Sequence, residues 1–245
     1  MYHFFITPDQ MQGKRAFITG KDVAHISLVL RMKPGEMLLI STGEDWDYLC
    51  EITAITPEQV ELAVTQEHVG ARELPSRVFL LQGLPKGDKM EDILKKSIEL
   101  GVHQVLPVIT KRCIVRLEGR KKEAKRQRWQ AIAEGAAKQS NRSLIPQVQL
   151  PVALEEALEQ VGNLPVKLMP YEKAQGMDQT RKILGELKPG EDVAVLIGPE
   201  GGFEEEEVKL AQKAGFIPIT LGRRILRTET AGVALLGNIM FRLEE

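Results

Sequence analysis

Two stretches near the C-terminus decide the fold: Leu196-Ile197-Gly198-Pro199-Glu200-Gly201-Gly202-Phe203 and Leu221-Gly222-Arg223-Arg224-Ile225-Leu226-Arg227-Thr228-Glu229-Thr230-Ala231. Each stretch follows a short apolar run that is typical of a buried strand, at 193–197 and at 216–220. Each also precedes a segment with helical spacing of apolar residues, at 204–214 and at 228–243. Strand–loop–helix units of this kind indicate an α/β domain, in which ligands bind on the loops at the carboxyl ends of the strands.

The first loop is rich in glycine, which lets backbone amides approach a ligand closely. The helix that follows opens with Glu204 to Glu207, which suits the helix dipole but repels a phosphate. There is no Gly-Lys-Ser or Gly-Lys-Thr, so the loop is not an ATP-binding P-loop. These features favour a ligand that combines an adenosine with a positive charge, as S-adenosylmethionine does. A tight structural turn is the alternative for this loop taken alone.

The second loop places three arginines and Glu229 where a ligand is expected, and Thr228 is predicted to be the N-cap of the last helix. The alternative is a surface loop with solvated arginines. The Gly-x-Gly fingerprint of the usual Rossmann methyltransferases is missing after the first predicted strand. An adenosylmethionine site in this chain must therefore belong to another architecture.

Outward from these loops, the chain divides near residue 72 into two expected domains, 1–72 and 73–245. The second alternates strands and helices, which predicts an α/β domain with a mostly parallel sheet. Its remaining predicted strands are 78–81, 104–109, 148–150 and 166–169, with helices at 88–101, 120–138, 154–161 and 178–187. The first has short strands at 15–19, 37–41, 46–55 and 59–64 and a helix at 21–30, which predict a small β-barrel or meander.

The composition of the 245 residues is that of a globular protein, with 43% hydrophobic and 27% charged residues and a net charge of −1. Two cysteines, no apolar run near ~20 residues and no signal-like N-terminus lead us to expect a cytoplasmic protein without a membrane segment. The charge is uneven: residues 1–70 carry five basic and ten acidic groups, whereas 111–142 carry eleven basic and three acidic groups. The second segment is either a surface for a polyanion or a solvated helix face.

The paired loops resemble the signature of the SPOUT methyltransferases, and specifically of the RsmE family, which makes N3-methyluridine in 16S ribosomal RNA (uridine 1498 in the customary numbering of that RNA). Further similarity covers the rest of the chain, at 30–35, 95–102 and 134–142. One segment departs from the family pattern, at 168–172 directly after a predicted strand.

The resemblance implies an N-terminal PUA-like β-barrel that binds RNA, followed by a C-terminal SPOUT α/β domain whose chain forms a trefoil knot. It implies a homodimer, whose apolar last helix is consistent with a covered surface. It also implies that S-adenosyl-L-methionine is the methyl donor, held largely by backbone groups. Carried onto this chain, the pocket residues are Met169, Ile197, Gly198, Glu200, Gly201, Leu221, Gly222, Ile225, Leu226 and Ala231.

Methylation of uridine N3 requires the loss of an imide proton and the stabilisation of the resulting anion. Arg227 is the candidate for pairing with that charge, because a guanidinium keeps its proton. Glu229 either orients Arg227, acts as a general base or caps the last helix. No metal is expected, because the four histidines show no ligand spacing. The candidates for RNA contact are Arg31, Lys33, Arg112, Lys138 and Arg142.

Because the net charge gives little general attraction to RNA, we expect the substrate to be 16S ribosomal RNA in a structured small-subunit particle. Two other functions share the same sequence features. One is methylation of a ribose 2′-hydroxyl with the same cofactor loops, and the other is an RNA-binding assembly factor whose pocket has lost its activity.

Overall fold

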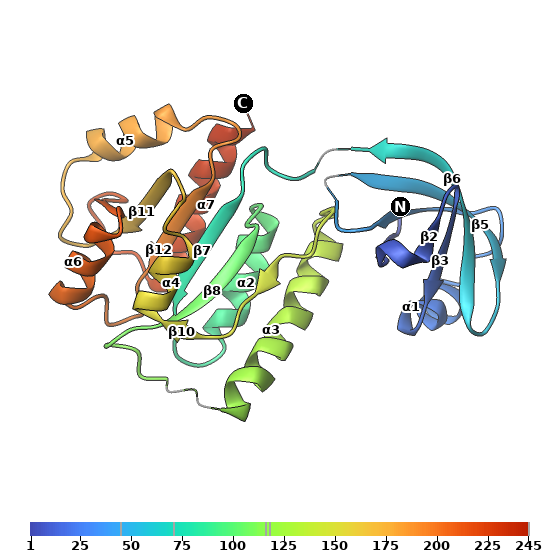
Figure 1. Cartoon of the computed structure of the whole chain (residues 1–245), viewed down its shortest axis with the longest axis horizontal. Helices are drawn as coiled ribbons and strands as arrows, with labels where there is room; N and C mark the ends of the chain where they lie inside the picture. The colour runs from blue at the N-terminus through green and yellow to red at the C-terminus, as the bar shows by residue number, and fades with distance from the viewer. Residues whose placement is uncertain (45, 71, 116, 118, 245) are drawn as a thin grey trace. The chain divides into compact units, whose positions relative to one another are not determined.

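The structure is a computed structural model that describes residues 1–44, 46–70, 72–115, 117 and 119–244. It contains two compact units, shown in Figure 1. Unit 1 comprises residues 1–73 and 137–145, and unit 2 comprises residues 74–136 and 146–245. The expected boundary at residue 72 lies within one residue of the first crossing between units. No local pattern predicted that residues 137–145, which include the end of the basic helix, belong to unit 1.

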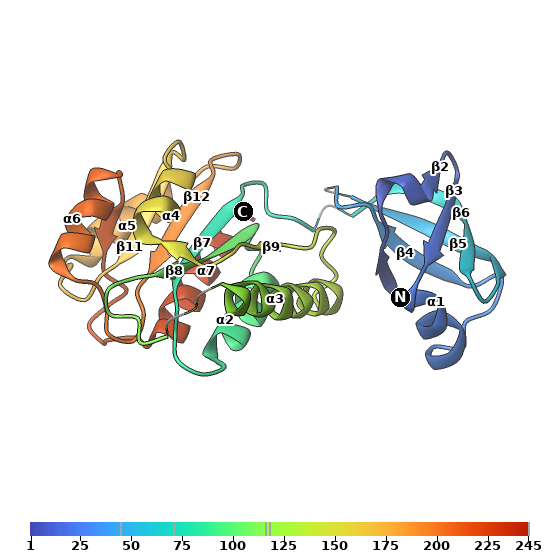
Figure 2. The ribbon, with the colours of Figure 1, turned by 60° about the horizontal axis from the view of Figure 1, so that its bottom comes forward.

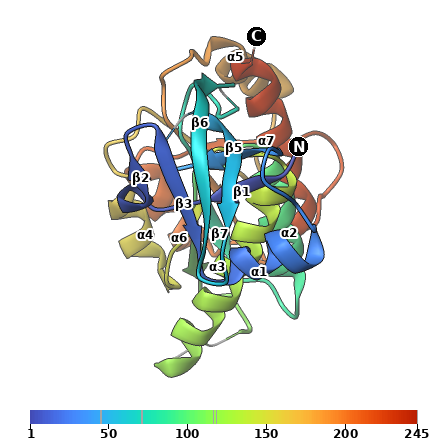
Figure 3. The same ribbon diagram turned by 90° about the vertical axis from the view of Figure 1, so that its right-hand side faces the viewer.

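Unit 1 is built on a six-stranded mixed sheet in the order β1-β4-β5-β6-β3-β2. Strand β1 is parallel to β4, and all other neighbours are antiparallel. In Figure 3 the strands β3, β6 and β5 lie side by side. The bounds are β1 His3–Phe5, β2 Met11–Gln12, β3 Arg15–Thr19, β4 Met37–Ser41, β5 Asp47–Ile55 and β6 Gln59–Val69.

The four long strands agree with the prediction, and the two short strands β1 and β2 were not predicted because three or two residues are too few to show alternation. The expected helix at 21–30 is instead a four-residue helix, α1 Lys21–Ala24, continued by a π-helical turn at His25–Val29. A 3-10 turn occupies Pro8–Gln10. One apolar core, including Ile18, Ile40 and Ile52, fills the unit.

Two buried carboxylates hold the separate pieces of unit 1 together. Asp47 is fully buried at the start of β5, where it accepts hydrogen bonds from the hydroxyl of Ser41 and from Nη1 of Arg72. His3 Nε2 lies 2.5 Å from the same Ser41 hydroxyl, which links β1 to this cluster. Glu73 pairs with Arg142 and accepts the backbone N–H of Ser143 at 3.0 Å. These contacts explain why residues 137–145 belong with the N-terminal sheet.

Unit 2 contains a seven-stranded sheet in which every pair of neighbours is parallel. The order is β10-β8-β7-β12-β11-β13, with β9 also paired to β8. The bounds are β7 Val78–Gly83, β8 Gln104–Ile109, β9 Gln147–Val148, β10 Val152–Ala153, β11 Val166–Pro170, β12 Val193–Ile197 and β13 Ile217–Ile219. The predicted strand at 148–150 is replaced by β9 and β10, which lie on either side of Pro151.

Helices cover both faces of this sheet, as Figures 1 and 2 show. Helices α4 and α6 pack on one face against Leu106, Ala194 and Leu196, while α2 and α7 pack against each other on the opposite face. Strand β12 is therefore buried on both sides, which explains its uninterrupted apolar sequence. The bounds are α2 Lys89–Glu99, α3 Arg120–Gln139, α4 Leu154–Gln160, α5 Met177–Glu186, α6 Glu205–Lys213 and α7 Thr228–Leu243.

The predicted α/β class and the mostly parallel sheet are confirmed, and the second unit matches the prediction closely. The trefoil knot concerns the path of the chain through its own loops, which strand order alone does not test, and it stays a prediction.

Candidate active site

A cavity of about 520 Å³ opens at the carboxyl ends of three neighbouring strands of unit 2, β12, β11 and β13. The loops after these strands supply most of its wall, as expected for an α/β sheet. Its lining consists of Lys89, Pro170, Tyr171, Glu172, residues 197–203, residues 220–228 and Ala231. Both loops that were singled out in the sequence therefore meet in one pocket.

Nine of the ten residues proposed to bind a cofactor line this cavity. Met169 does not: it is fully buried on β11 and packs in the core between the sheet and α6. The lining begins one residue later, at Pro170, and includes Tyr171 and Glu172. Tyr171 and Glu172 were not predicted, because the segment 168–172 departs from the expected family pattern. Their position directly after a buried strand was the available signal.

The two loops are joined by buried side chains. The hydroxyl of Thr228 donates a hydrogen bond of 2.6 Å to the carbonyl oxygen of Gly198, and it accepts one of 2.9 Å from Nε2 of Gln82 on β7. The prediction that Thr228 is the helix N-cap is wrong, because Thr228 is the first residue of α7. Arg227 has the extended N-cap conformation, and its carbonyl oxygen accepts the N–H groups of Thr230 and Ala231. The Thr228 side chain instead joins α7 to the glycine-rich loop.

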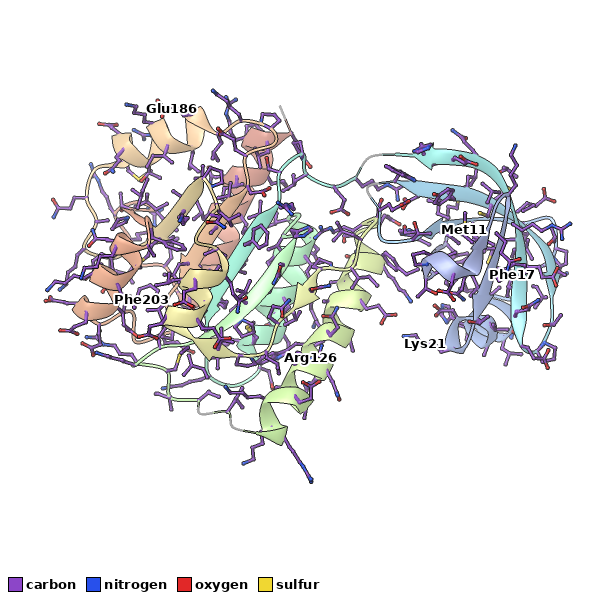
Figure 4. All side chains as sticks on the ribbon, in the orientation of Figure 1. Met11, Phe17, Lys21, Arg126, Glu186 and Phe203 are labelled. Atoms are coloured by element: carbon purple, nitrogen blue, oxygen red, sulfur yellow. The ribbon has the colours of Figure 1, made fainter. Side chains whose placement is uncertain are left out.

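Close packing explains two of the glycines near the site, Gly83 and Gly198. A Cβ atom at Gly83 would lie 2.6 Å from the backbone nitrogen of Pro199, so the end of β7 touches the glycine-rich loop directly. A Cβ at Gly198 would lie 3.1 Å from the ring of Phe203, which is buried under the loop and labelled in Figure 4. A Cβ at Gly201 would meet Arg112 rather than the cavity, at 3.0 Å. A larger residue at Gly201 would thus act through Arg112.

Two carboxylates and two cations cluster beside the cavity: Lys89, Glu200 and Arg227 line it, whereas the predicted catalytic residue Glu229 is outside its lining. Lys89 Nζ, at the start of α2, lies 3.0 Å from Glu200 and 3.5 Å from Oε2 of Glu229. Nη1 of Arg227 lies 4.0 Å from the other carboxylate oxygen of Glu229, and its side chain is 82% exposed. The arrangement leaves Arg227 free to contact a substrate, while Glu229 is mostly buried.

The contacts between Glu200 and Lys89 favour the ionised form of both side chains. Burial alone would raise the pKa of Glu200, but hydrogen bonds from its own backbone, from Lys89 and from the Lys86 N–H hold that pKa below its ordinary value. The hydrogen bond to Glu200 raises the pKa of Lys89. Lys89 was not among the predicted site residues. Lys89 begins the helix after β7, at the same edge of the sheet. This position was the available signal.

Arg112, proposed for RNA contact, borders the outer side of the glycine-rich loop. Its Nε donates to Glu204 at 2.8 Å, and its Nη1 donates to the carbonyl oxygen of Gly201 at 2.9 Å. The hydrogen bond to Glu204 raises the pKa of Arg112 and lowers that of Glu204. Arg112 therefore neutralises part of the acidic start of α6 and holds the glycine-rich loop in place. Its side chain remains partly exposed to solvent.

The other predicted RNA contacts lie in unit 1 and fall into three situations. Arg31 and Lys33 are exposed, and Arg31 has a φ of 56°, which is uncommon for a residue other than glycine. Lys138 is partly buried beside Asp22, 3.4 Å away. Arg142 is only 4% exposed and is paired with Glu73. The prediction that Arg142 contacts phosphate is wrong for this structure, because its guanidinium is engaged in the interior.

The basic helix α3 is partly neutralised by its own neighbours. Arg126, labelled in Figure 4, pairs with Glu123 at 2.7 Å, and Arg128 pairs with Glu91 of α2 at 2.6 Å. Lys121 remains exposed and Lys125 partly exposed. The positive surface is thus smaller than the count of basic residues indicates.

Among the described residues, no three or more His, Cys, Asp or Glu side chains are grouped so that they could hold a metal ion. Within the same residues, no helix has both the length and the apolar character needed to cross a bilayer.

Comparisons with known proteins agree with the fold. A family described as RNA methyltransferase domain matches residues 72–240, and a family described as RNA methyltransferase PUA domain matches residues 18–65. Ribosomal RNA small subunit methyltransferase E of Bacillus subtilis is 33% identical over 99% of this chain and 96% of its own length. The enzyme of the same name from Mesomycoplasma hyopneumoniae is 32% identical over 96% of this chain and 97% of its own length.

A solved structure of ribosomal RNA small subunit methyltransferase E from Neisseria gonorrhoeae, bound to S-adenosyl methionine, superimposes with a TM-score of 0.82. It is 32% identical and covers 98% of this chain and 97% of that chain. A putative methyltransferase from Legionella pneumophila with bound SAM gives a TM-score of 0.81 at 32% identity, over 97% of this chain and 96% of that chain.

The fold and the cavity at the strand ends, with these relatives, define an RNA methyltransferase with a PUA domain. Within that class, the chain belongs to the ribosomal RNA small subunit methyltransferase E family.

Proposed function

We propose that this protein transfers a methyl group from S-adenosylmethionine to N3 of a uridine in 16S ribosomal RNA. The observation that carries the proposal is that one cavity, at the ends of β11, β12 and β13, brings together both sequence stretches that resemble the family signature. The relatives named ribosomal RNA small subunit methyltransferase E support it, and so do two similar solved structures that hold the cofactor.

The residues of the cavity fit this cofactor. Its volume of about 520 Å³ lies within the ~300–1,000 Å³ that is typical of small-molecule sites. The wall combines backbone groups of Gly198, Gly201 and Gly202 with the apolar side chains of Ile197 and Leu226. Glu200 and Glu229 add negative charge near a ligand that is itself a cation. The bound cofactor would supply an electrophilic methyl group.

The protein's own residues would then manage the charge on the uracil. N3 lies on the Watson–Crick edge, so the target base must be unpaired and turned out of its stack before it can enter the site. Removal of the N3 proton leaves negative charge on the ring and its carbonyl oxygens. The exposed guanidinium of Arg227 is placed to pair with that charge. Glu229, which is mostly buried and faces Lys89, is the candidate to accept the proton.

The wider assembly is part of the same proposal. Unit 1 would bind RNA through the exposed Arg31 and Lys33, with 16S RNA presented in a structured small-subunit particle in the cytoplasm. A homodimer built on unit 2 would cover the apolar side of α7, on which Phe241 is 70% exposed. Residues 1–72 would form the RNA-binding domain, and residues 73–245 would form the methyltransferase domain.

An in vitro assay tests the chemistry. Purified protein and S-adenosylmethionine are incubated with small ribosomal subunits that lack the modification, with and without EDTA, and the RNA is digested to nucleosides for mass spectrometry. We expect N3-methyluridine in both conditions. A ribose-methylated nucleoside would indicate a 2′-O-methyltransferase, and no methylated product alongside firm RNA binding would indicate an assembly factor.

A further inference from the structure

The side chain of Lys89 joins three parts of unit 2 that are distant in sequence. Its ammonium lies 3.0 Å from Oε1 of Glu200, on the loop after β12, and 3.5 Å from Oε2 of Glu229, in the first turn of α7. Lys89 itself begins α2. One cation from a third element therefore holds carboxylates from both loops that build the cavity.

The neighbourhood of Glu200 shows that this contact is built into the fold. The backbone N–H of Lys86 also donates to the Glu200 carboxylate, at 3.1 Å. Gly83, just before it in the chain, allows the end of β7 to touch Pro199. The segment from 83 to 89 is thus docked along the glycine-rich loop, and it fixes the root of the Lys89 side chain.

Glu229 depends on this cation more than Glu200 does. Its Oε2 is buried, and within the described part of the chain it accepts no hydrogen bond, so its interaction with Lys89 is an ion pair at 3.5 Å. The charged groups that face Glu229 are Lys89 from α2 and Arg227, two residues earlier in the chain, and Lys89 also contacts the carboxylate of Glu200. Arg227 is 4.0 Å away and mostly in solvent, where its effect is screened.

We propose that Lys89 is a positioning residue for methyl transfer, which ties the two cofactor loops together through Glu200 and Glu229 and so sets the shape of the cavity. This inference rests on the proposed function and deepens it. Without Lys89, the carboxylates of Glu200 and Glu229 would face each other with no cation between them, and their repulsion would push the two loops apart.

The test compares Lys89→Met with Lys89→Arg, and uses Lys95→Met as a control. Lys95 is an exposed lysine on the same helix, away from the cavity. For each protein, the dissociation constant for S-adenosylmethionine is measured by calorimetry, and thermal unfolding shows that the fold is intact. For Lys89→Met we expect this dissociation constant to rise about tenfold, because the two loops lose their shared cation. Lys89→Arg keeps the cation and should recover most of the affinity. Lys95→Met should bind the cofactor as the wild type does.

An unchanged dissociation constant in Lys89→Met would overturn the proposal, and so would equal losses of affinity in Lys89→Met and Lys89→Arg. A second readout does not require the cofactor. Carbon-13 NMR of labelled glutamate side chains follows the Glu200 carboxyl, whose titration should move to higher pH in Lys89→Met and stay in place in Lys95→Met. An unmoved Glu200 titration would refute the bridge itself. If wild-type protein makes no N3-methyluridine while Glu200 shifts as expected, the proposed reaction fails and the bridge stands.

Discussion

The hydroxyl of Thr228 lies 2.6 Å from the carbonyl oxygen of Gly198, so that the last helix is anchored to the glycine-rich loop thirty residues earlier. The donor is itself fixed, because Gln82 Nε2 donates to the same hydroxyl from the buried strand β7. The two walls of the cavity thus share one buried hydrogen-bond relay. Buried polar contacts of this kind are costly to break because the remaining partners lose their hydrogen bonds without regaining water.

Replacement of Thr228 by valine keeps the shape of the side chain but removes both hydrogen bonds. We expect the dissociation constant for S-adenosylmethionine to rise about tenfold, which corresponds to about 1.4 kcal/mol, because the loops lose their fixed spacing. Isothermal titration calorimetry measures the change. Thr228→Ser retains the hydroxyl and should bind within about a factor of three of the wild type. Equal binding by the valine and serine variants would contradict the role of the relay.

The close approach of Gly83 to Pro199 predicts that Gly83→Ala destabilises unit 2. The added methyl group would meet backbone atoms at 2.6 Å, which can only be relieved by moving the loop. Overpacking of this kind typically costs about 1–3 kcal/mol, measured here by urea unfolding. The matched control is Gly135→Ala in the middle of α3, where the new Cβ meets nothing within 4 Å. The control should be neutral or should stabilise the protein by up to about 1 kcal/mol, because alanine favours a helix. A Gly83→Ala variant as stable as the wild type would mean that the loop is not held against β7.

The buried Asp47 predicts that unit 1 loses stability in acid. Burial alone would raise the pKa of Asp47, but the hydrogen bonds from His3 and Ser41 lower it below its ordinary value of 3.8. A lowered pKa means that the ionised carboxylate stabilises the folded state fully above about pH 3.8, and that this stability is lost as the pH falls through the lower folded pKa.

Urea unfolding followed through Trp46, in a Trp129→Phe background, reports on unit 1. We expect its free energy of unfolding to decline below pH 4 in the wild type. In Asp47→Asn, stability should be lower at neutral pH and its decline in acid should be shallower. Asp9→Asn, which alters an exposed carboxylate, should preserve the wild-type slope. Parallel slopes for Asp47→Asn and the wild type would refute the assignment.

Arg227→Ala should separate binding from catalysis. The guanidinium is 82% exposed and carries no packing role, so cofactor affinity and thermal stability should remain close to the wild-type values. Loss of a charge-assisted contact to the uracil anion is worth roughly 1.5–3 kcal/mol, which lowers kcat by about one to two decades. Single-turnover assays at saturating RNA measure this, and Arg227→Lys should recover part of the rate. A comparable loss of cofactor affinity would show that Arg227 builds the cavity instead.

Much of unit 2 was predictable because its longer strands are apolar runs and helices such as α2 carry their own periodicity. The residues 193–197 and 228–243 are examples in which the local pattern and the packing agree. The location of the cavity followed from the same pattern, since loops after parallel strands meet at one edge.

What the sequence did not reveal depends on contacts between distant residues. No local pattern distinguishes Arg142, which is buried against Glu73, from the exposed Arg31, because the difference lies in a partner 69 residues away. Met169 and Tyr171 lie two residues apart, yet only Tyr171 lines the cavity, because β11 ends between them. Lys89 was missed for the same reason: its partners, Glu200 and Glu229, come from two other loops.

Deletion of this gene should remove one methyl group from 16S ribosomal RNA, and this loss can be measured directly in cells. N3-methylation blocks Watson–Crick pairing, so reverse transcription across the RNA of the parent strain should stop at one uridine, and nucleoside mass spectrometry should detect N3-methyluridine. The deletion strain should lack both signals, the wild-type gene should restore them, and the Arg227→Ala gene should restore them poorly. An unchanged stop and an unchanged N3-methyluridine level in the deletion strain would contradict the proposal that this protein methylates N3 of a uridine in 16S ribosomal RNA.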